Sequence, residues 1–369
     1  MAEKDSTKIE FANTLRGFAA LLVMFGHYSM TFWQYRDVAG GLVNATPLSA
    51  EVETPGYLLA LNAVDPFVFG LFGVGLFFLI SGFVIPFSFQ RAEWRGFVVG
   101  RVLRIYPTYW AGLTVSVLVI LGMGLLYGKN YPYSVGVTAL NYVPGLRDLA
   151  GAPGIDGVIW TLDIEIKFYV VCALAAGLLR TGRLVTFLIP IVLAIPAIIG
   201  GQAMSTYGLT VLFVNFMFIG VAFNFLYRGL LTRRAVLSIA AGLFGVMCAV
   251  WWATSTMPKI LLLTYGLAIL AFSAAFALPW AFRSRRVTDF FAAISYPLYV
   301  VHGVMGYAVL RLVAEQVPAW LAIAIASVCS IAVATAIHYL VESPSHQLGR
   351  RLSSRFRQEF VAPVAAPSS

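Results

Sequence analysis

Charge is the property that this chain has least of. Only 11% of its 369 residues are charged and 60% are hydrophobic, whereas about a quarter of the residues of an ordinary soluble domain are charged. The apolar residues come in runs of about twenty, the length that crosses a hydrocarbon core of about 30 Å as a helix. Lipid offers the backbone no hydrogen-bond partners, so these runs are expected to be helices. The composition therefore excludes an ordinary soluble domain.

Cysteine is scarce as well. Cys172, Cys248 and Cys329 all fall inside apolar runs, without metal-type spacing or a disulfide partner in a loop. We interpret them as packing residues and expect no metal site.

The segment from Met1 to Glu10 is polar and lacks the basic-then-apolar pattern of a signal peptide. The first helix is therefore expected to be retained.

The chain also lacks a strongly basic face. A formal net charge of +9 would suit a nucleic-acid-binding protein, but the basic residues are distributed among short loops. We therefore predict no nucleic-acid partner and interpret the placement of the cations as a topology signal.

The apolar runs predict an all-α polytopic membrane protein with about ten transmembrane helices. One membrane domain is expected over residues 1–360, followed by a disordered tail rich in Pro, Ala and Ser over residues 361–369. The predicted helices lie near residues 12–33, 66–88, 105–127, 158–179, 184–203, 209–227, 235–254, 260–281, 289–312 and 318–341.

Sorting the cations by alternate loops predicts that both termini are cytoplasmic, because short cytoplasmic loops carry an excess of Lys and Arg. The cations of one side are Lys4, Lys8, Arg91, Arg95, Arg101, Arg104, Arg180, Arg183, Arg228, Arg233, Arg234, Arg283, Arg285, Arg286, Arg350, Arg351, Arg355 and Arg357. Those of the opposite side are Arg36, Lys129, Arg147, Lys259 and Arg311. The two longest loops, 34–65 and 128–157, then face outward as a candidate lid over a cavity.

Arg16 and His27 are the first candidates for a site, because ionisable groups inside a membrane helix normally face the bundle interior. They are eleven residues apart, which places them on one helix face and about 16 Å apart along its axis. A cation at the cytoplasmic mouth with an imidazole deeper inside suits an anionic cosubstrate whose reactive end reaches inward. The alternative is a snorkelling Arg and a His satisfied by a neighbouring helix.

The fourth predicted helix contains three charged residues. Asp163 and Lys167 stand at i and i+4 and are expected to pair with each other. That pairing leaves Glu165 without a local partner, and an unpaired carboxylate in a membrane is a site candidate. An interhelical partner such as His or Tyr is the structural alternative.

The ninth and tenth helices carry further polar residues. Ser295, Tyr299 and His302 share one helix face, where they act either as interhelical contacts or, for His302 above all, in a site. At the end of the tenth helix, Pro344 is expected to end the helix. A solvated helix end accounts for the pair His338 and Glu342, one turn apart, and for His346.

Small residues and arginines mark the second and third helices. The glycines of the second helix, together with Ser81, allow close approach of another helix or a ligand; they are Gly73, Gly75 and Gly82. Arg101 and Arg104 precede Tyr106-Pro107 at the expected cytoplasmic entrance to the third helix. They are either positive-inside anchors or phosphate ligands.

Taken together and in order, these residues resemble the membrane acyltransferase-3 family, which transfers acyl groups to hydroxyls of carbohydrates and other metabolites. The resemblance runs over nearly the whole chain. It rests on six blocks, which are Arg16 with His27, Gly73 to Phe83, Arg101 to Pro107, Trp160 to Tyr169, Ser295 to His302 and Tyr339 to Pro344.

The resemblance implies a mechanism. Acyl-CoA, with acetyl as the expected acyl group, would enter from the cytoplasm as cosubstrate and no other cofactor is expected. Its phosphates would be held by Arg16, Arg101 and Arg104. His27 would act as general base on the acceptor hydroxyl or accept the acyl group itself.

The remaining candidates are assigned to the same reaction. Glu165 would orient an imidazole or bind the acceptor, and Ser81 would contact the thioester. Trp160, Tyr299 and His302 complete the predicted substrate-binding set. The acceptor would be a carbohydrate or lipid-linked glycan at a bacterial inner membrane. Some relatives carry an extra extracytoplasmic domain, so a separate extracytoplasmic protein is expected to supply any second acyl-transfer step.

A proton-coupled exporter of a glycan or small metabolite is the main rival, because buried His, Glu and Arg also build transport pathways. An exporter moves its substrate intact and consumes no thioester, which separates the two functions. A purely structural scaffold is disfavoured by the number of ionisable groups inside the predicted helices.

Overall fold

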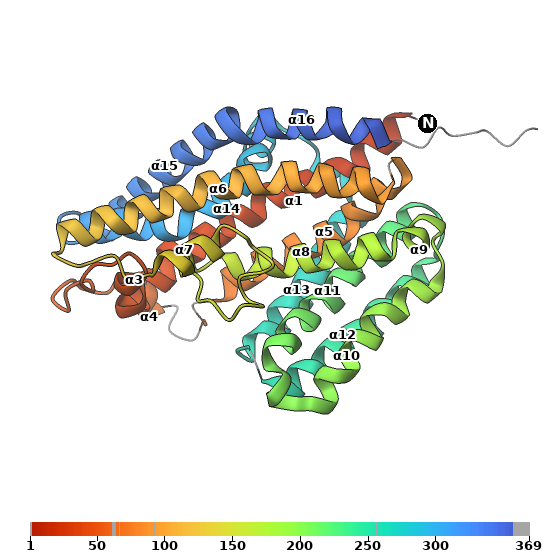
Figure 1. Cartoon of the computed structure of the whole chain (residues 1–369), viewed down its shortest axis with the longest axis horizontal. Helices are drawn as coiled ribbons and strands as arrows, with labels where there is room; N and C mark the ends of the chain where they lie inside the picture. The colour runs from red at the N-terminus through yellow and green to blue at the C-terminus, as the bar shows by residue number, and fades with distance from the viewer. Residues whose placement is uncertain (1, 61–63, 66, 92, 256, 357–369) are drawn as a thin grey trace, which may run out of the picture.

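The computed structural model describes residues 2–60, 64–65, 67–91, 93–255 and 257–356. Within these residues every regular element is a helix, as the composition predicts. Figure 1 shows long helices that run roughly side by side, with short connections at the two ends. The predicted tail, 361–369, lies outside the described residues.

Each of the ten predicted segments coincides with a helix of the structure. These helices are α1 (Ala2–Gly26), α5 (Val68–Arg91), α6 (Trp94–Leu126), α8 (Ile159–Leu174), α10 (Leu188–Gly200), α11 (Ser205–Tyr227), α12 (Arg233–Thr254), α13 (Ile260–Ala277), α14 (Arg286–Val313) and α15 (Ala319–Ile337). Shorter helices are α2 (Phe32–Gln34), α3 (Arg36–Leu42), α4 (Gly56–Ala60), α7 (Val135–Asn141), α9 (Ala176–Thr181) and α16 (Ser343–Ser353).

Seven stretches of the described chain are long and apolar enough to cross a membrane, judged by length and composition. They comprise α5, α6, α12, α13, α14, the stretch Leu184–Tyr227 with α10 and α11, and the stretch Ala319–Phe356 with α15 and α16. With 16 residues, α8 is shorter than this group. The chain is therefore a multi-pass integral membrane protein.

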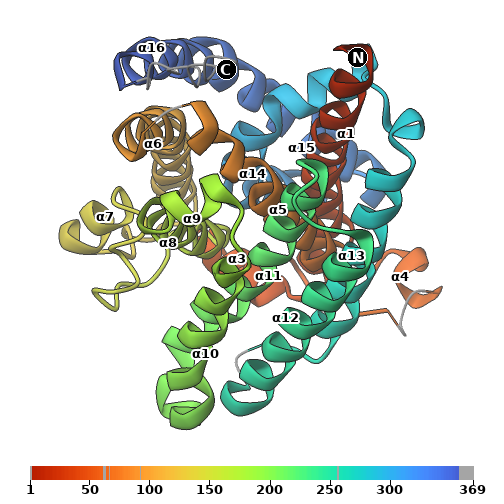
Figure 2. The ribbon, with the colours of Figure 1, turned by 90° about the vertical axis from the view of Figure 1, so that its right-hand side faces the viewer.

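Two helices organise the packing. The helix α14 contacts α1, α6 and α15, and the helix α5 contacts α1, α11 and α13. Figure 2 shows α10 and α12 at the edge of the molecule opposite to α6 and α16. The contact of α5 with α11 is made backbone to backbone: a Cβ at Gly82 would lie 1.9 Å from the carbonyl oxygen of Met217, and one at Gly220 would lie 2.3 Å from that of Leu79. The close approach predicted for Gly82 is thus confirmed.

Two predicted helix boundaries that lie beside proline are wrong. The third helix was expected near residue 105, but α6 begins at Trp94 and contains Pro107. Arg101 and Arg104 therefore project from a helix instead of a loop. Pro344 does not stop the chain's helical course either, because a π-helical turn at His338–Glu342 leads directly into α16. Pro344 stands in the first turn of α16, where no N–H is needed.

The two longest loops lie at one end of the molecule, where Figure 1 places α3, α4 and α7. They pack on each other: the Asn44 amide donates to the carbonyl oxygen of Asn130 over 3.1 Å, and the Lys129 ammonium donates to that of Ala45 over 2.9 Å. The N-terminal end of α1 and the helix α16 lie at the opposite end. The loops 34–65 and 128–157 therefore form one joint cover on a single face of the bundle.

Candidate functional site

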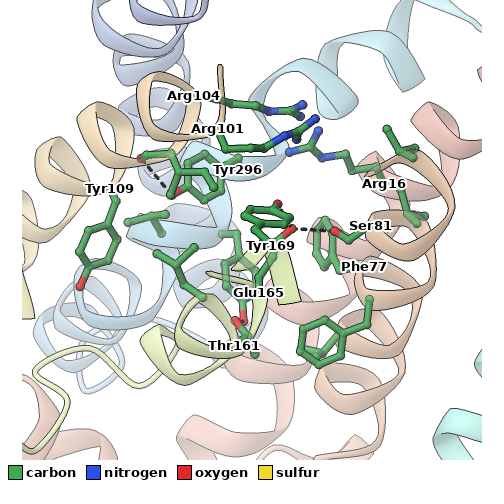
Figure 3. A pocket seen from close by; sticks show the side chains of 18 of the residues that line it. Arg16, Phe77, Ser81, Arg101, Arg104, Tyr109, Thr161, Glu165, Tyr169 and Tyr296 are labelled. Atoms are coloured by element: carbon green, nitrogen blue, oxygen red, sulfur yellow. Dashed lines mark hydrogen bonds between the residues drawn. The ribbon is translucent and has the colours of Figure 1, made fainter. Parts of the chain in front are cut away.

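A cavity of about 180 Å³ lies between α1, α5, α6, α8 and α14. We call it the cationic cavity, because three arginines stand at one end of it (Figure 3). Most of its wall is apolar, and the predicted site residues among its lining are Arg16, Ser81, Arg101, Arg104, Glu165 and Tyr299. Five of the ten predicted helices thus contribute to a single cavity.

The arginines come from two helices, Arg16 from α1 and Arg101 and Arg104 from α6. Figure 3 shows their guanidinium groups directed toward one another. Arg101 donates to the Ser88 hydroxyl over 3.1 Å and stands over the ring of Tyr169, 5.6 Å from its centroid. Within the described residues none of the three forms an ion pair. The three guanidiniums outnumber the carboxylates that act on them, those of Glu165 and Glu342, so the group suits a phosphate-bearing anion.

Glu165 lies next to the arginines and has partners, contrary to the expectation that it lacks a local one. Its Oε1 accepts a hydrogen bond from the Ser81 hydroxyl over 2.6 Å and another from the hydroxyl of Tyr169, one turn along α8. A tyrosine partner was the structural alternative. The link to Ser81 ties α8 to α5 at the wall of the cationic cavity.

The expected pairing of Asp163 with Lys167 is wrong. Asp163 pairs with Arg147 over 2.5 Å and accepts from the backbone N–H of Gly145 over 2.7 Å. Lys167 pairs instead with Asp148. The partners Arg147 and Asp148 both belong to the loop 128–157, which folds along α8. The helical-spacing rule considers partners in the same helix alone, so it misses these two charges. The two ion pairs fix the position of the helix that carries Glu165.

A second, smaller cavity of about 140 Å³ lies between the end of α1, α5, α8 and α14. We call it the histidine chamber. Its lining includes His27, Thr31, Phe67, Gly70, Trp160 and Tyr299. Two predicted site residues, His27 and Trp160, line this chamber and not the cationic cavity.

His27 stands where α1 changes into a π-helical turn, His27–Thr31; such turns occur often at functional sites. Its Nδ1 is hydrogen-bonded to the Tyr307 hydroxyl over 2.8 Å. The Nε2 atom faces the chamber beside Gly70, where an added Cβ would lie 4.0 Å away. Tyr307 therefore orients this imidazole, which was one of the two roles considered for Glu165, and no sequence signal singled Tyr307 out.

His302 lies beside His27, fully buried on α14. Its Nδ1 is 2.8 Å from the carbonyl oxygen of Tyr299 and 3.1 Å from that of Leu298. Carbonyl oxygens only accept hydrogen bonds, so Nδ1 carries the proton and Nε2 is left as an acceptor. That buried Nε2 has no partner within the described residues. An unsatisfied acceptor at 1% exposure beside a cavity indicates a place for a donor from a ligand.

Tyr299 separates the two cavities, because together with Val74 and Val158 it lines both. Its hydroxyl is hydrogen-bonded to that of Thr161 over 2.7 Å. Its ring packs against Phe77 and His302, with centroid distances of 5.6 and 5.7 Å. The tyrosine predicted on the shared face of α14 thus forms the wall between the arginines and the histidines. Among the described residues, the hydrogen-bond partner of the Ser295 hydroxyl is the carbonyl oxygen of Ala292 in the same helix.

Comparisons with known proteins identify the family of the chain. The sequence profile of a family described as an acyltransferase domain matches residues 9–339. A curated relative, nodulation protein 10 of Rhizobium leguminosarum bv. viciae, is 26% identical over 376 aligned residues, which cover 92% of this chain and 94% of that protein. No solved structure matches the chain.

Proposed function

We propose that this chain, which belongs to the membrane acyltransferase-3 family, moves an acyl group from acyl-CoA to a hydroxyl of a carbohydrate or glycan. Acetyl is the group we favour. The chain is an acyltransferase on the strength of its family, and the cavities suggest how donor and acceptor are divided.

The cationic cavity suits the donor. Its volume of about 180 Å³ is below the roughly 300–1,000 Å³ of a site that encloses a drug-sized ligand. A whole acyl-CoA would not fit, but its narrow pantetheine arm would pass along the apolar wall. The phosphates would then remain at the mouth, beside Arg16, Arg101 and Arg104. Ser81, held by the hydrogen bond that it donates to Glu165, would contact the thioester end of the arm, so that Glu165 acts through Ser81.

The histidine chamber suits the acceptor hydroxyl. With Tyr299 displaced, the thioester would reach the chamber, and the Nε2 atom of His27 would take the proton of this hydroxyl while the oxygen bonds to the thioester carbon. The carbon–sulfur bond then breaks, and the CoA sulfur leaves with the proton from His27. Direct acylation of His27, followed by transfer to the acceptor, would use the same atom. Trp160 offers an aromatic wall for the apolar face of a sugar.

We further propose that the arginine end of the bundle faces the cytoplasm and that the joint loop cover faces the other side of a bacterial inner membrane. Acyl-CoA would then reach its cavity from the cytoplasm, and the acceptor would approach His27 from the opposite side. If a second acyl-transfer step follows, a separate extracytoplasmic protein would carry it out.

The observation that carries the proposal is the position of His27, bonded to Tyr307 in a chamber that one tyrosine separates from a cavity with three arginines. The experiment uses purified protein in vesicles with isotope-labelled acetyl-CoA and a glycan and lipid extract of cells that lack the protein. Mass spectrometry should find a labelled mass increment on an acceptor. An exporter would leave both acetyl-CoA and the extract unchanged, and that result would reject the proposal.

A further inference from the structure

The helix α16 lies along α6 at the arginine end of the bundle, as Figure 1 shows. The Ser353 hydroxyl donates to the carbonyl oxygen of Gly96 over 2.8 Å. At Gly349, an added Cβ would lie 3.1 Å from the Cβ of Leu103 and 3.7 Å from the carbonyl oxygen of Gly100. The helix is therefore held against the part of α6 that carries the cavity's two arginines.

His346 and Arg350 share the face of α16 that meets α6. His346 precedes Gly349 by three residues, and Arg350 precedes Ser353 by three. This spacing places all four positions on one side of a helix. His346 is half-buried, so the solvated helix end predicted for it is wrong. It lies on the face of α16 that packs against the part of α6 with Arg101 and Arg104.

The surroundings of His346 are cationic. The charges of Arg16, Arg101, Arg104 and Arg350 all act on it. Glu342, one turn before His346, is the nearest acidic group on the same stretch, is 7% exposed and also acts on Arg16. However, its Oε2 is already bonded to the Nδ1 of His338 over 2.7 Å.

Four guanidiniums that lie close together repel one another unless an anion with several charges binds between them, and a neutral imidazole beside them donates a hydrogen bond to such an anion. The three arginines of the cavity mouth account for one or two phosphate groups. His346 and Arg350 extend the same cationic surface outward, away from the apolar channel. A ligand that spans both parts carries more than one phosphate along its length.

We propose that His346 and Arg350 form a second anion subsite, which binds the phosphates at the nucleotide end of the acyl donor. This inference rests on the proposed function, and it extends the donor site from the cavity onto α16. The subsite would recognise the donor's nucleotide part and leave the chemistry at His27 unaffected.

The test compares acetyl-CoA with acetyl-pantetheine, which has the same thioester and lacks all phosphates. Full-length protein is assayed in vesicles of phosphatidylcholine, as wild type, His346→Ala, Arg350→Ala and the double variant. Arg351→Ala is the matched control, because Arg351 is an exposed cation next in sequence and on another face of α16. Thermal unfolding in detergent checks that each variant is folded, and His346→Gln replaces any His346→Ala protein that is not.

The double variant should raise the KM for acetyl-CoA by at least about tenfold, as loss of hydrogen bonds to charged groups does. The KM for acetyl-pantetheine and both kcat values should stay unchanged, as should all constants of Arg351→Ala. An equal rise for both donors, or no rise for acetyl-CoA, would overturn the subsite. So would an effect that is seen only after anionic lipid is added, since the ligand would then be a lipid headgroup. A wild-type protein that uses neither donor would remove the proposed function itself.

Discussion

The imidazole rings of His27 and His302 stand perpendicular to each other with their centroids 5.0 Å apart. One ring comes from the end of α1 and the other from the middle of α14. In each ring Nδ1 is engaged, by the Tyr307 hydroxyl in one case and by backbone carbonyls in the other. The Nε2 atom of His27 faces the histidine chamber, and the buried Nε2 atom of His302, which lines neither cavity, has no partner within the described residues. This pair defines the centre at which we place the acceptor hydroxyl.

His302 is predicted to orient the acceptor. In His302→Phe the ring still fills its buried place, but the acceptor atom Nε2 is gone. We expect kcat to fall about tenfold, the loss of one hydrogen bond, with the KM for acyl-CoA unchanged. Steady-state kinetics with both substrates varied tests this. A wild-type kcat in a folded His302→Phe protein would show that His302 serves packing alone.

The bond between Tyr299 and Thr161 is predicted to keep the wall between the cavities closed until an acceptor binds. Both Tyr299→Phe and Thr161→Val remove it with little change in size. Each variant should increase hydrolysis of acyl-CoA in the absence of acceptor, because water would reach the thioester from the histidine chamber. Since one bond is lost in either case, the double variant should behave like each single one. Additive effects would show that the two residues act separately.

The ion pair of Arg147 with Asp163 is predicted to stabilise the fold around α8. Arg147 is 8% and Asp163 2% exposed, and removing one partner of a buried pair typically costs about 3–5 kcal/mol. Asp163→Ala should therefore lower the thermal unfolding midpoint in detergent clearly. Lys167→Met is the matched control at the less buried pair with Asp148 and should lower it less. Equal midpoints for the two variants would contradict this assignment.

Much of the fold follows from the sequence because lipid leaves an apolar run few alternatives to a helix. The ten segments were found in this way, and so was the close packing at Gly82. The errors arise where a rule considers one helix by itself. Lys167 was paired by helical spacing with Asp163, although the folded loop brings Asp148 to it.

The sequence identified several residues of the candidate site, but it did not show how they are arranged. Charges and motifs identified Arg16, His27 and Glu165, but only the packing shows that His27 and Glu165 line different cavities. Tyr307 was missed, because a tyrosine in an apolar helix carries no pattern that separates it from core residues. The π-helical turn that positions His27 has no sequence signature either.

The orientation in the membrane gives a further prediction. The cations of the predicted cytoplasmic side outnumber those of the other side, which argues for an inward-facing arginine end. Reporters fused after Arg234 and after Ser369 should behave as cytoplasmic, and one inserted near Gly151 as external. An external reporter signal at Ser369 would reverse the side from which acyl-CoA enters the protein.

The measurement that tests the whole account most directly is acyl transfer by His27→Gln. Glutamine keeps the approximate size and hydrogen-bonding capacity of the imidazole, but an amide does not take up the hydroxyl proton. Transfer of labelled acetyl from acetyl-CoA to the acceptor should therefore fall about 10²–10⁴-fold, nearly as far as in His27→Ala, with expression and membrane insertion intact. Transfer by His27→Gln at close to the wild-type rate would contradict the assignment of His27 as the catalytic residue.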